Sequence, residues 1–251
     1  MSASAPLNHA NARPEVLVVA MARMLRGLRH VAVGAASPIP ATAALLAREQ
    51  ATADAPMRVT ILGSMRHADF TNGGVELFDM AGQGRIDAFF LGGGQIDGQA
   101  NINLVGTGDY PNVDVRWPGS FGSAYLYYVV PRVILFREEH SRRVLVPKVD
   151  FVSAPGSSSA GIFRRGGPYA LVTGKAVFMF DAQRQRFRLE SVHPGCSLEE
   201  VRDLTGFEFD NAADTSVADT ATPTVAEMIL MHGGVRAAVA ETYPRFAARL
   251  I

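Results

Sequence analysis

Three glycine-rich turns beside apolar runs form a pattern suited to binding an anion or a polarised carbonyl. The run Ala88–Leu91 leads directly into Gly92-Gly93-Gly94-Gln95, and further turns lie at residues 106–108 and 118–123. Glycines after a buried strand allow positive φ angles and let backbone N–H groups approach a ligand closely. Such donors suit a phosphate, a carboxylate or a developing oxyanion. For any single glycine a tight loop is the simpler interpretation, but the three turns together favour a ligand-binding edge.

The sequence lacks the common nucleotide fingerprints. Residues 92–97 have no final glycine of the pattern G-x-G-x-x-G, and the pattern G-x-x-x-x-G-K-[ST] does not occur. The pair Gly174-Lys175 is followed by Ala176 and is interpreted as a hairpin turn.

Ser64, His67 and Asp69 offer a local set of nucleophile, base and acid. Because the members of such triads usually come from distant parts of a chain, polar loop residues or subunit contacts are the favoured interpretation. Cys196 precedes a predicted helix, which would lower its pKa, yet a lone cysteine is usually a small buried hydrophobe. No metal is expected, because metal-site spacing is missing at histidines 30, 140, 193 and 232.

Length, charge and cysteine content limit the class of protein. The 251 residues include 24 basic and 24 acidic side chains, so neither nucleic acid nor a membrane surface is expected as a partner. A single cysteine and the lack of a long apolar run indicate a cytoplasmic protein without disulfides. Residues 1–13 are expected to form a disordered arm, and residues 14–251 a single domain.

Strand and helix patterns alternate in the first part of the chain, which predicts an α/β fold with an open, mainly parallel sheet. Later segments alternate with period two and predict an antiparallel meander followed by helices. The expected strands are 30–34, 58–62, 88–91, 132–136, 144–146, 150–153, 169–173, 175–180 and 186–192; the expected helices are 41–50, 75–82, 197–206 and segments that begin at Pro14 and at residues 222–223. Ligands of such sheets bind at the carboxyl ends of the strands, here loops 34–40, 62–74 and 92–97.

Several motifs, taken in order, resemble one enzyme family. They are residues 33–38, 91–97, 118–124, 142–143 with 149–156, and 197–201 with 205–209. Over about residues 16–209 the sequence resembles the β subunit of glutaconate-type CoA-transferases, family I. Arg142 and Arg143 could also grip a phosphate or a partner's carboxylates, or simply form a solvated loop.

The resemblance implies an open α/β sheet of the CoA-transferase and sugar-phosphate isomerase kind. It also implies an α subunit of similar fold as partner, in an α2β2 heterotetramer, with an acyl-CoA thioester as substrate between the subunits and no bound cofactor. The turn that matches residues 119–122 would donate a backbone N–H to the thioester oxygen. The positions implied to bind CoA or substrate are Gly34, Ala35, Gly92, Gly93, Gly94, Gln95, Gly119, Ser120, Phe121, Gly122 and Ser123.

One departure from the family concerns its catalytic glutamate. The family places this residue at the end of the strand that matches residues 58–62, where its carboxylate attacks the thioester and carries CoA. Here that position is Leu62, and the first acid after Asp54 is Asp69. Leucine cannot act as a nucleophile. The sequence therefore resembles a branch that decarboxylates acyl-CoA esters or hydrolyses their C–C bonds.

Two alternatives remain open. One is CoA transfer, with the nucleophile supplied by the partner or, after a shift, by Asp69 or Glu76. The other is a subunit that binds CoA esters without chemistry of its own. A CoA-exchange assay separates transfer from the leading hypothesis, and a neighbouring reading frame for an α subunit separates both from a free-standing binder.

Overall fold

Within residues 12–70, 73–211 and 217–250, which the computed structural model describes, an eight-stranded sheet has the order β12-β11-β10-β9-β8-β3-β1-β2. The strands are β1 His30–Val33, β2 Arg58–Ile61, β3 Ala88–Leu91, β8 Arg132–Arg137, β9 Pro168–Thr173, β10 Ala176–Asp181, β11 Arg186–Val192 and β12 Ala218–Asp219. Strands β2, β1, β3, β8 and β9 are parallel, whereas β9, β10 and β11 form the antiparallel meander. The expected open, mainly parallel sheet with a meander is confirmed.

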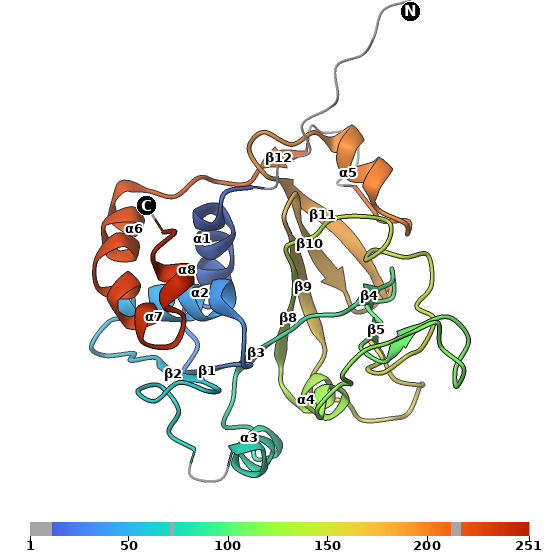
Figure 1. Cartoon of the computed structure of the whole chain (residues 1–251), viewed down its shortest axis with the longest axis horizontal. Coiled ribbons are helices and arrows are strands. Elements are labelled where there is room, and N and C mark those ends of the chain that lie inside the picture. The colour runs from blue at the N-terminus through green and yellow to red at the C-terminus, as the bar shows by residue number, and fades with distance from the viewer. Residues whose placement is uncertain (1–11, 71–72, 212–216, 251) are drawn as a thin grey trace, which may run out of the picture.

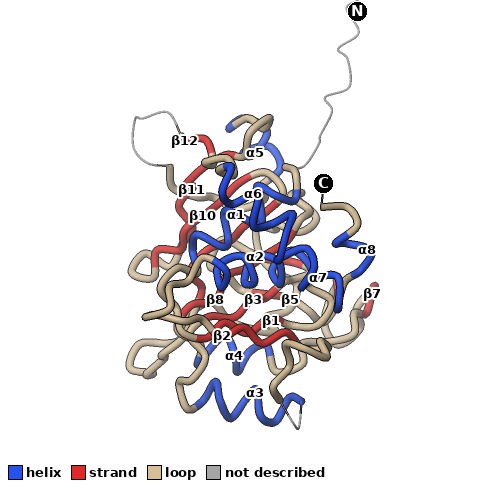
Figure 2. Tube along the Cα trace, turned by 90° about the vertical axis from the view of Figure 1, so that its left-hand side faces the viewer, coloured by secondary structure: helices blue, strands red, loops and turns tan. Residues whose placement is uncertain are grey.

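Two layers of helices cover one face of the parallel strands (Figure 1). Helices α1 (Pro14–Met24) and α2 (Pro38–Glu49) pack on the sheet, and the chain's last helices pack on them. These last elements are α6 Val225–Leu230, the π-helical turn η1 Met231–Val235, α7 Arg236–Thr242 and α8 Pro244–Ala247. Figure 2 views the molecule from this side, with α1, α2 and α6 in front of the strands. The second layer explains why Glu15 to Ala22 are all buried rather than forming one apolar stripe.

The other face carries α3 (Gly73–Gly82), α4 (Ser123–Val129) and a long excursion between β3 and α4. The excursion forms two small hairpins, β4 Gln95–Ile96 with β5 Ile102–Asn103, and β6 Gly106–Thr107 with β7 Val115–Arg116. A second core lies here and includes an aromatic group beside α5 (Leu198–Leu204), made of Phe178, Phe187, Phe207 and Phe209. The excursion places its glycine turns over the carboxyl ends of the parallel strands.

The prediction that residues 144–146 and 150–153 continue the main sheet is wrong. Leu145 forms an isolated bridge with Ile96, and Ala154 forms one with Ile102. The N–H groups of Ser153 and Ala154 both donate to the Ile102 carbonyl. These short apolar segments therefore pair with the β4–β5 hairpin, which offers free strand edges closer in the chain.

Several predicted boundaries shift for identifiable reasons. Helix α2 begins at Pro38, because a proline in the first turn gives up an N–H that would be unbonded anyway. Helix α6 begins at Val225, after Thr224 and Glu227 form a capping box. At α5, the Ser197 hydroxyl accepts from the Glu200 N–H as expected. The Gly174-Lys175 hairpin joins β9 to β10 as predicted.

The expected disordered arm falls mostly outside the described residues. Residues 1–11 and 212–216 are not described, and Ala12 is buried with its N–H donating to the Gly174 carbonyl at 2.7 Å. Over the described ranges, every helix is too short or too polar to cross a bilayer.

Candidate functional site

A cleft of about 490 Å³ lies at the carboxyl ends of β1, β2, β3 and β8, on the side of α3 and α4. We call it the glycine cleft; it is lined by Gly34, Ala35, Leu62, Leu77, Phe89, Phe90, Leu91, Gly92, Gly93, Gly94, Leu104, Trp117, Ser120, Phe121, Ser123, Leu126, Arg137 and Arg143. The volume suits a small-molecule group, and most of the walls are apolar. The cleft joins loops 34–40, 62–74 and 92–97, as expected for the carboxyl edge of a parallel sheet.

Of the positions that the resemblance implies to bind CoA or substrate, all line this cleft except Gln95, Gly119 and Gly122. Gly119 and Gly122 lie in the turn that borders it, and Gln95 is buried beneath it. The side-chain amide oxygen Oε1 of Gln95 accepts from the Asn103 side-chain amide at 2.8 Å and from the Asp150 backbone N–H at 3.0 Å. The Gln95 side chain therefore has partners within the chain that hold the floor of the cleft.

The three consecutive glycines are used differently from the expectation. None of Gly92, Gly93 and Gly94 has a positive φ, so the predicted left-handed turn is wrong here. A Cβ on Gly94 would overlap the ring of Trp117, and one on Gly93 would lie 2.7 Å from the Gln95 carbonyl. Glycine is needed because neighbouring groups pack directly on this backbone.

The turn at residues 118–123 does have the left-handed backbone. Gly119 and Gly122 have φ angles of 108° and 68°, and Phe121 has 34°, an unfavourable value for an aromatic residue. Phe121 is 70% exposed at the mouth of the cleft. Ser123 begins α4 and is 2% exposed, and its Oγ has no hydrogen-bond partner among the described residues. The turn thus presents polar groups without internal partners.

Leu62 forms part of the apolar wall. Its N–H donates to the Val33 carbonyl at 2.9 Å, which extends the pairing of β2 with β1 by one residue. The side chain is half-buried and lines the glycine cleft. Of the described residues that line this cleft, none is an aspartate or a glutamate. A carboxylate nucleophile is therefore missing from the position where the sequence resemblance places one.

Ser64 and the loop after β2 are held by Glu241 of α7, a residue that the sequence did not single out. The Ser64 hydroxyl and the Met65 N–H each donate to the Glu241 carboxylate at 2.7 Å. The Ser64 Oγ in turn accepts from the N–H groups of Arg66 and His67. Hydrogen bonds from Thr242 and Ser64 lower the pKa of Glu241 to about 2. These contacts identify Ser64 and Glu241 as anchors of the loop.

The other members of the local triad do not converge on Ser64. Asp69 pairs with Arg58 at 3.0 Å, and His67 Nδ1 lies 3.4 Å from the Arg48 guanidinium. Burial and, to a smaller extent, the charge of Arg48 lower the pKa of His67, whose buried Nε2 has no hydrogen-bond partner among the residues that the structure describes. Burial also raises the pKa of Cys196, which makes its thiol a poorer nucleophile.

Two arginines line one side of the glycine cleft and share a single carboxylate. Arg143 and Arg137 both pair with Glu139, Arg137 at 3.8 Å, and the Ser141 hydroxyl donates to Glu139 at 2.6 Å. Although partial burial raises the pKa of Glu139, bonds from Ser141 and Arg143 lower it overall. Two guanidinium groups beside one carboxylate leave an excess positive charge that would attract an anionic ligand.

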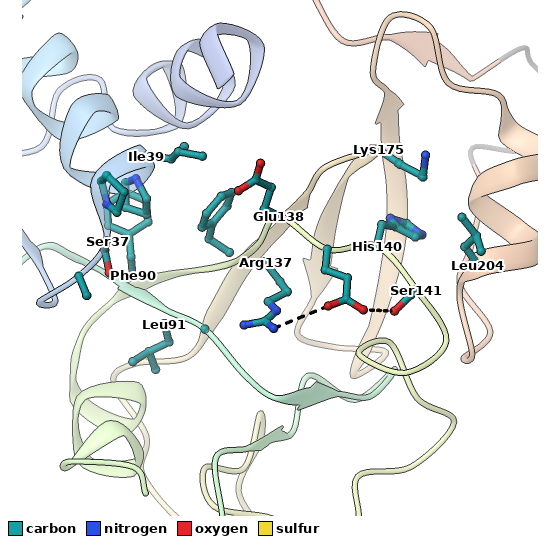
Figure 3. Close-up of a pocket in the computed structure, with 16 residues that line it drawn as sticks. Ser37, Ile39, Phe90, Leu91, Arg137, Glu138, His140, Ser141, Lys175 and Leu204 are labelled. Carbon is teal, nitrogen blue, oxygen red and sulfur yellow. Dashed lines mark hydrogen bonds and ion pairs between the residues drawn. The ribbon is translucent and has the colours of Figure 1, made fainter. Parts of the chain in front are cut away.

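A second, larger cleft of about 810 Å³ lies on the α2 side of the same strand ends (Figure 3). We call it the α2 cleft. In Figure 3, Ser37 and Ile39 of the α2 end face Lys175, His140 and Leu204 across it, and dashed lines join Glu139 to Arg137 and Ser141. Phe90, Leu91, Gly92 and Arg137 line both clefts.

Polar side chains of the α2 cleft are largely paired within the chain. The buried Lys175 ammonium pairs with Glu200 at 2.8 Å. Both ring nitrogens of His140 contact threonine hydroxyls, those of Thr173 at 2.7 Å and Thr205 at 3.0 Å, and burial lowers its pKa to about 4. Within the described residues, Lys175 and His140 of this cleft are therefore paired, whereas the buried Ser123 hydroxyl of the glycine cleft is not.

Comparison with known proteins agrees with this arrangement. The family model described as Coenzyme A transferase matches residues 9–204. The chain belongs to the coenzyme A transferase family. It is 33% identical over 151 residues to the B-type subunit of 3-oxoadipate CoA-transferase from Pseudomonas knackmussii, covering 58% of this chain and 57% of that protein. It is also 26% identical over 235 residues to the cholesterol ring-cleaving hydrolase IpdB subunit of Rhodococcus jostii, covering 88% and 90%.

Solved structures of this coenzyme A transferase fold include enzymes of different activity. The decarboxylase AibA/AibB has a TM-score of 0.73 and 25% identity, covering 96% of this chain and 99% of that one. IpdAB of Rhodococcus jostii RHA1 has a TM-score of 0.77 at 24% identity, covering 95% and 97%, and supports the fold alone. The first-named sequence relative is matched over little more than half its length. Family membership therefore leaves the reaction to be argued from the site.

Proposed function

We propose that the chain is a B-type subunit of an enzyme that decarboxylates an acyl-CoA thioester or hydrolyses one of its C–C bonds, without carrying CoA itself. The observation that supports this most directly is Leu62 in the wall of the glycine cleft, with no carboxylate lining the described part of that cleft. Covalent CoA transfer through this chain would need an acid there.

Both reactions share one requirement that the cleft can meet. When carbon dioxide leaves carbon 2, or when water adds to the carbonyl of an acyl group on carbon 2 and that group leaves as a carboxylic acid, the bonding electron pair stays on carbon 2 and spreads onto the thioester oxygen. The carbon is then protonated. A backbone N–H aimed at that oxygen stabilises the developing charge. Among described residues the Gly122 N–H has no acceptor, and it lies in the left-handed turn beside the cleft.

The substrate's anionic groups would be held at the arginine side. Arg137 and Arg143 share Glu139, so an incoming carboxylate or phosphate gains a guanidinium partner without leaving Glu139 unpaired. The apolar walls would hold the acyl chain and exclude water from the enolate oxygen.

An α subunit is proposed to complete the site, in an α2β2 heterotetramer. Phe121, Tyr125 and Val75 are exposed next to the glycine cleft, and the Phe78 ring packs against those of Phe121 and Tyr125. Exposed aromatic and aliphatic side chains around a ligand cleft are typical of a protein interface. The relatives carry the names of B-type CoA-transferase subunits or of the IpdB subunit.

CoA transfer is the second candidate, and the names of two relatives favour it. The B-type subunit of glutaconate CoA-transferase from Acidaminococcus fermentans is 34% identical over 128 residues, 48% of this chain and 47% of that protein. In that case the partner would supply the nucleophile, because Asp69 is paired with Arg58 and lines neither cleft described above.

Intact-mass spectrometry tests the proposal. The complex, purified with the subunit that co-purifies, is incubated with malonyl-CoA and acetoacetyl-CoA, which carry a carboxyl and an acyl group on carbon 2, and the mass of this chain is measured. We expect no CoA-sized adduct and no loss of activity with hydroxylamine. Release of carbon dioxide or of a shortened acyl-CoA is followed in parallel, with CoA exchange into acetate as the competing reaction.

The matched variant is Leu62→Glu, which places a carboxylate at the end of β2. The half-buried position can hold a glutamate, and an adduct that forms in the variant shows that the thioester reaches residue 62. A stoichiometric adduct on any carboxylate of the unmodified chain would establish CoA transfer instead.

A further inference from the structure

Ser123 is the most unusual polar group of the glycine cleft. Its side chain is 2% exposed and lines the cleft, yet its Oγ has no hydrogen-bond partner within the described residues. Its backbone N–H is already used, donating to the Ser120 carbonyl at 2.8 Å. A buried hydroxyl left without a partner destabilises the fold, so such a group calls for an explanation.

A bound water is a poor partner for this hydroxyl. An ordered water needs two to four polar partners. The side chains that share the cleft with Ser123 are mostly apolar, with Leu62, Leu77 and Phe89 among them, and the arginines are already paired with Glu139. A ligand oxygen, carried into the cleft on an apolar chain, satisfies the hydroxyl without further polar groups.

We propose that Ser123 is a specificity-determining residue, whose hydroxyl binds an oxygen at carbon 3 of the acyl group. The inference rests on the proposed function, in which the Gly122 N–H meets the thioester oxygen. Consecutive Cα atoms lie about 3.8 Å apart, so the Ser123 hydroxyl stands a few ångströms from that donor. An acyl chain with oxygens at carbons 1 and 3 presents its two oxygens at a similar spacing. The enzyme then selects 3-oxo- or 3-hydroxyacyl-CoA over the unsubstituted ester.

The test compares three CoA esters of equal length: acetoacetyl-CoA, 3-hydroxybutyryl-CoA and butyryl-CoA. Their dissociation constants are measured by calorimetry on the chain purified from its natural source with any subunit that stays bound. The unmodified protein should bind one or both oxygenated esters about tenfold more tightly than butyryl-CoA, the effect of one added hydrogen bond. In Ser123→Ala that preference should disappear while butyryl-CoA binds as before.

Ser64→Ala is the matched control, because it removes a serine hydroxyl from the other loop at the same sheet edge, where the hydroxyl is bonded to Glu241. It should leave the preference unchanged. Ser123→Ala removes a hydroxyl that has no partner among the described residues, so folding should be preserved and the comparison interpretable.

The outcomes separate this inference from the proposed function. If butyryl-CoA binds but the oxygenated esters bind no better, or if their advantage survives in Ser123→Ala, the role of Ser123 is refuted and the proposed function stands. If none of the three esters binds, both are refuted.

Discussion

Two loops at the same edge of the sheet differ in whether their polar groups have hydrogen-bond partners within the described residues. In the loop after β2, the Ser64 hydroxyl makes three contacts, including the one to Glu241, and the Met65 N–H has the same partner. In the turn before α4, the Ser123 hydroxyl and the Gly122 N–H have no partners among the described residues. Both loops are rich in glycine and serine, so residue type alone does not distinguish them.

The difference supports the proposal that the turn before α4 binds the ligand. A polar group satisfied within the chain stabilises the fold and gains little from a ligand. A polar group left unsatisfied costs stability until a ligand supplies the partner, which is the pattern of a binding site. The comparison therefore supports a structural role for the loop after β2 and the proposed ligand-binding role for the turn before α4.

The largest effect is expected from pH, which acts on polar groups that are buried and partnered elsewhere in the chain. Burial lowers the pKa of His140 and of His193 to about 4 from 6.5. Near pH 5 the folded state therefore binds fewer protons than the unfolded chain. The contribution of these two histidines to stability is fully present above about pH 6.5 and is lost as pH falls toward 4. Urea unfolding should show about 3 kcal/mol less stability at pH 5 than at pH 7.

The double variant His140→Gln with His193→Gln is the control, since it removes both titrations. Its stability should be lower at pH 7 and change much less between pH 7 and pH 5. An unchanged pH dependence would show that these buried, hydrogen-bonded groups do not carry the effect.

Matched glycine substitutions test the two loops directly. Gly122→Ala puts a Cβ onto the Phe78 ring at a position with φ of 68°, so the turn must move and its N–H is lost as a donor. Loss of such a donor lowers kcat about a hundredfold or more. Gly63→Ala, in the loop after β2, has φ of 87° and no atom within 4 Å of the new Cβ. It should cost about 1 kcal/mol of stability and keep the turnover of the acyl-CoA substrate. Equal losses of activity in Gly122→Ala and Gly63→Ala would contradict the proposed difference in role between the two loops.

Removing Glu241 tests whether the loop after β2 is structural. Glu241→Ala deletes the acceptor of Ser64 and Met65, and thermal unfolding should show a loss of about 1–2 kcal/mol, reduced from a buried case because the carboxylate is partly exposed. Glu241→Gln should fall between the two proteins. Steady-state kinetics should be unchanged, and a loss of activity beyond tenfold would make Glu241 part of the chemistry.

The smallest expected effect is on the free energy of unfolding, which should respond differently to the loss of each of the two serine hydroxyls. Ser64→Ala should lower the free energy of unfolding by about 1 kcal/mol, because its partners lose a hydrogen bond. Ser123→Ala should leave it unchanged or slightly raised, because the lost hydroxyl has no partner in the described part of the chain. Calorimetric melting of both variants measures this. A clear loss of stability in Ser123→Ala would mean that its hydroxyl is bonded within the fold.

The sheet was predictable wherever a short apolar run had no competing partner. Strands β1, β2 and β3 follow from their buried Val, Ile and Phe residues, and their alternation with helices implies parallel pairing. Residues 144–146 have the same apolar character, but a nearby hairpin supplies their hydrogen bonds. Periodicity describes which face a residue prefers and does not identify the strand that it meets.

Much of the glycine cleft was also predictable. Gly34, Ala35, Gly93 and Ser120 were expected at a common edge, and the rule for parallel sheets brings them together. Trp117 and Arg137 were missed, because neither stands in a glycine turn or at a recognised motif. The glycines at 92–94 were assigned a left-handed turn, whereas the packing of Trp117 on Gly94 accounts for the lack of a side chain.

Residue type and local spacing were enough to predict the parallel strands and the places where the chain turns, and the family resemblance pointed to Leu62 at the position of the family's nucleophile. They could not show which hydroxyls are satisfied, because hydrogen bonds join residues far apart in the chain. Ser64 meets a glutamate 177 positions away, whereas Ser123 meets no acceptor among the described residues. Two serines that look alike in the sequence therefore differ in their surroundings, because within the described residues the Ser64 hydroxyl has hydrogen-bond partners and the Ser123 hydroxyl has none.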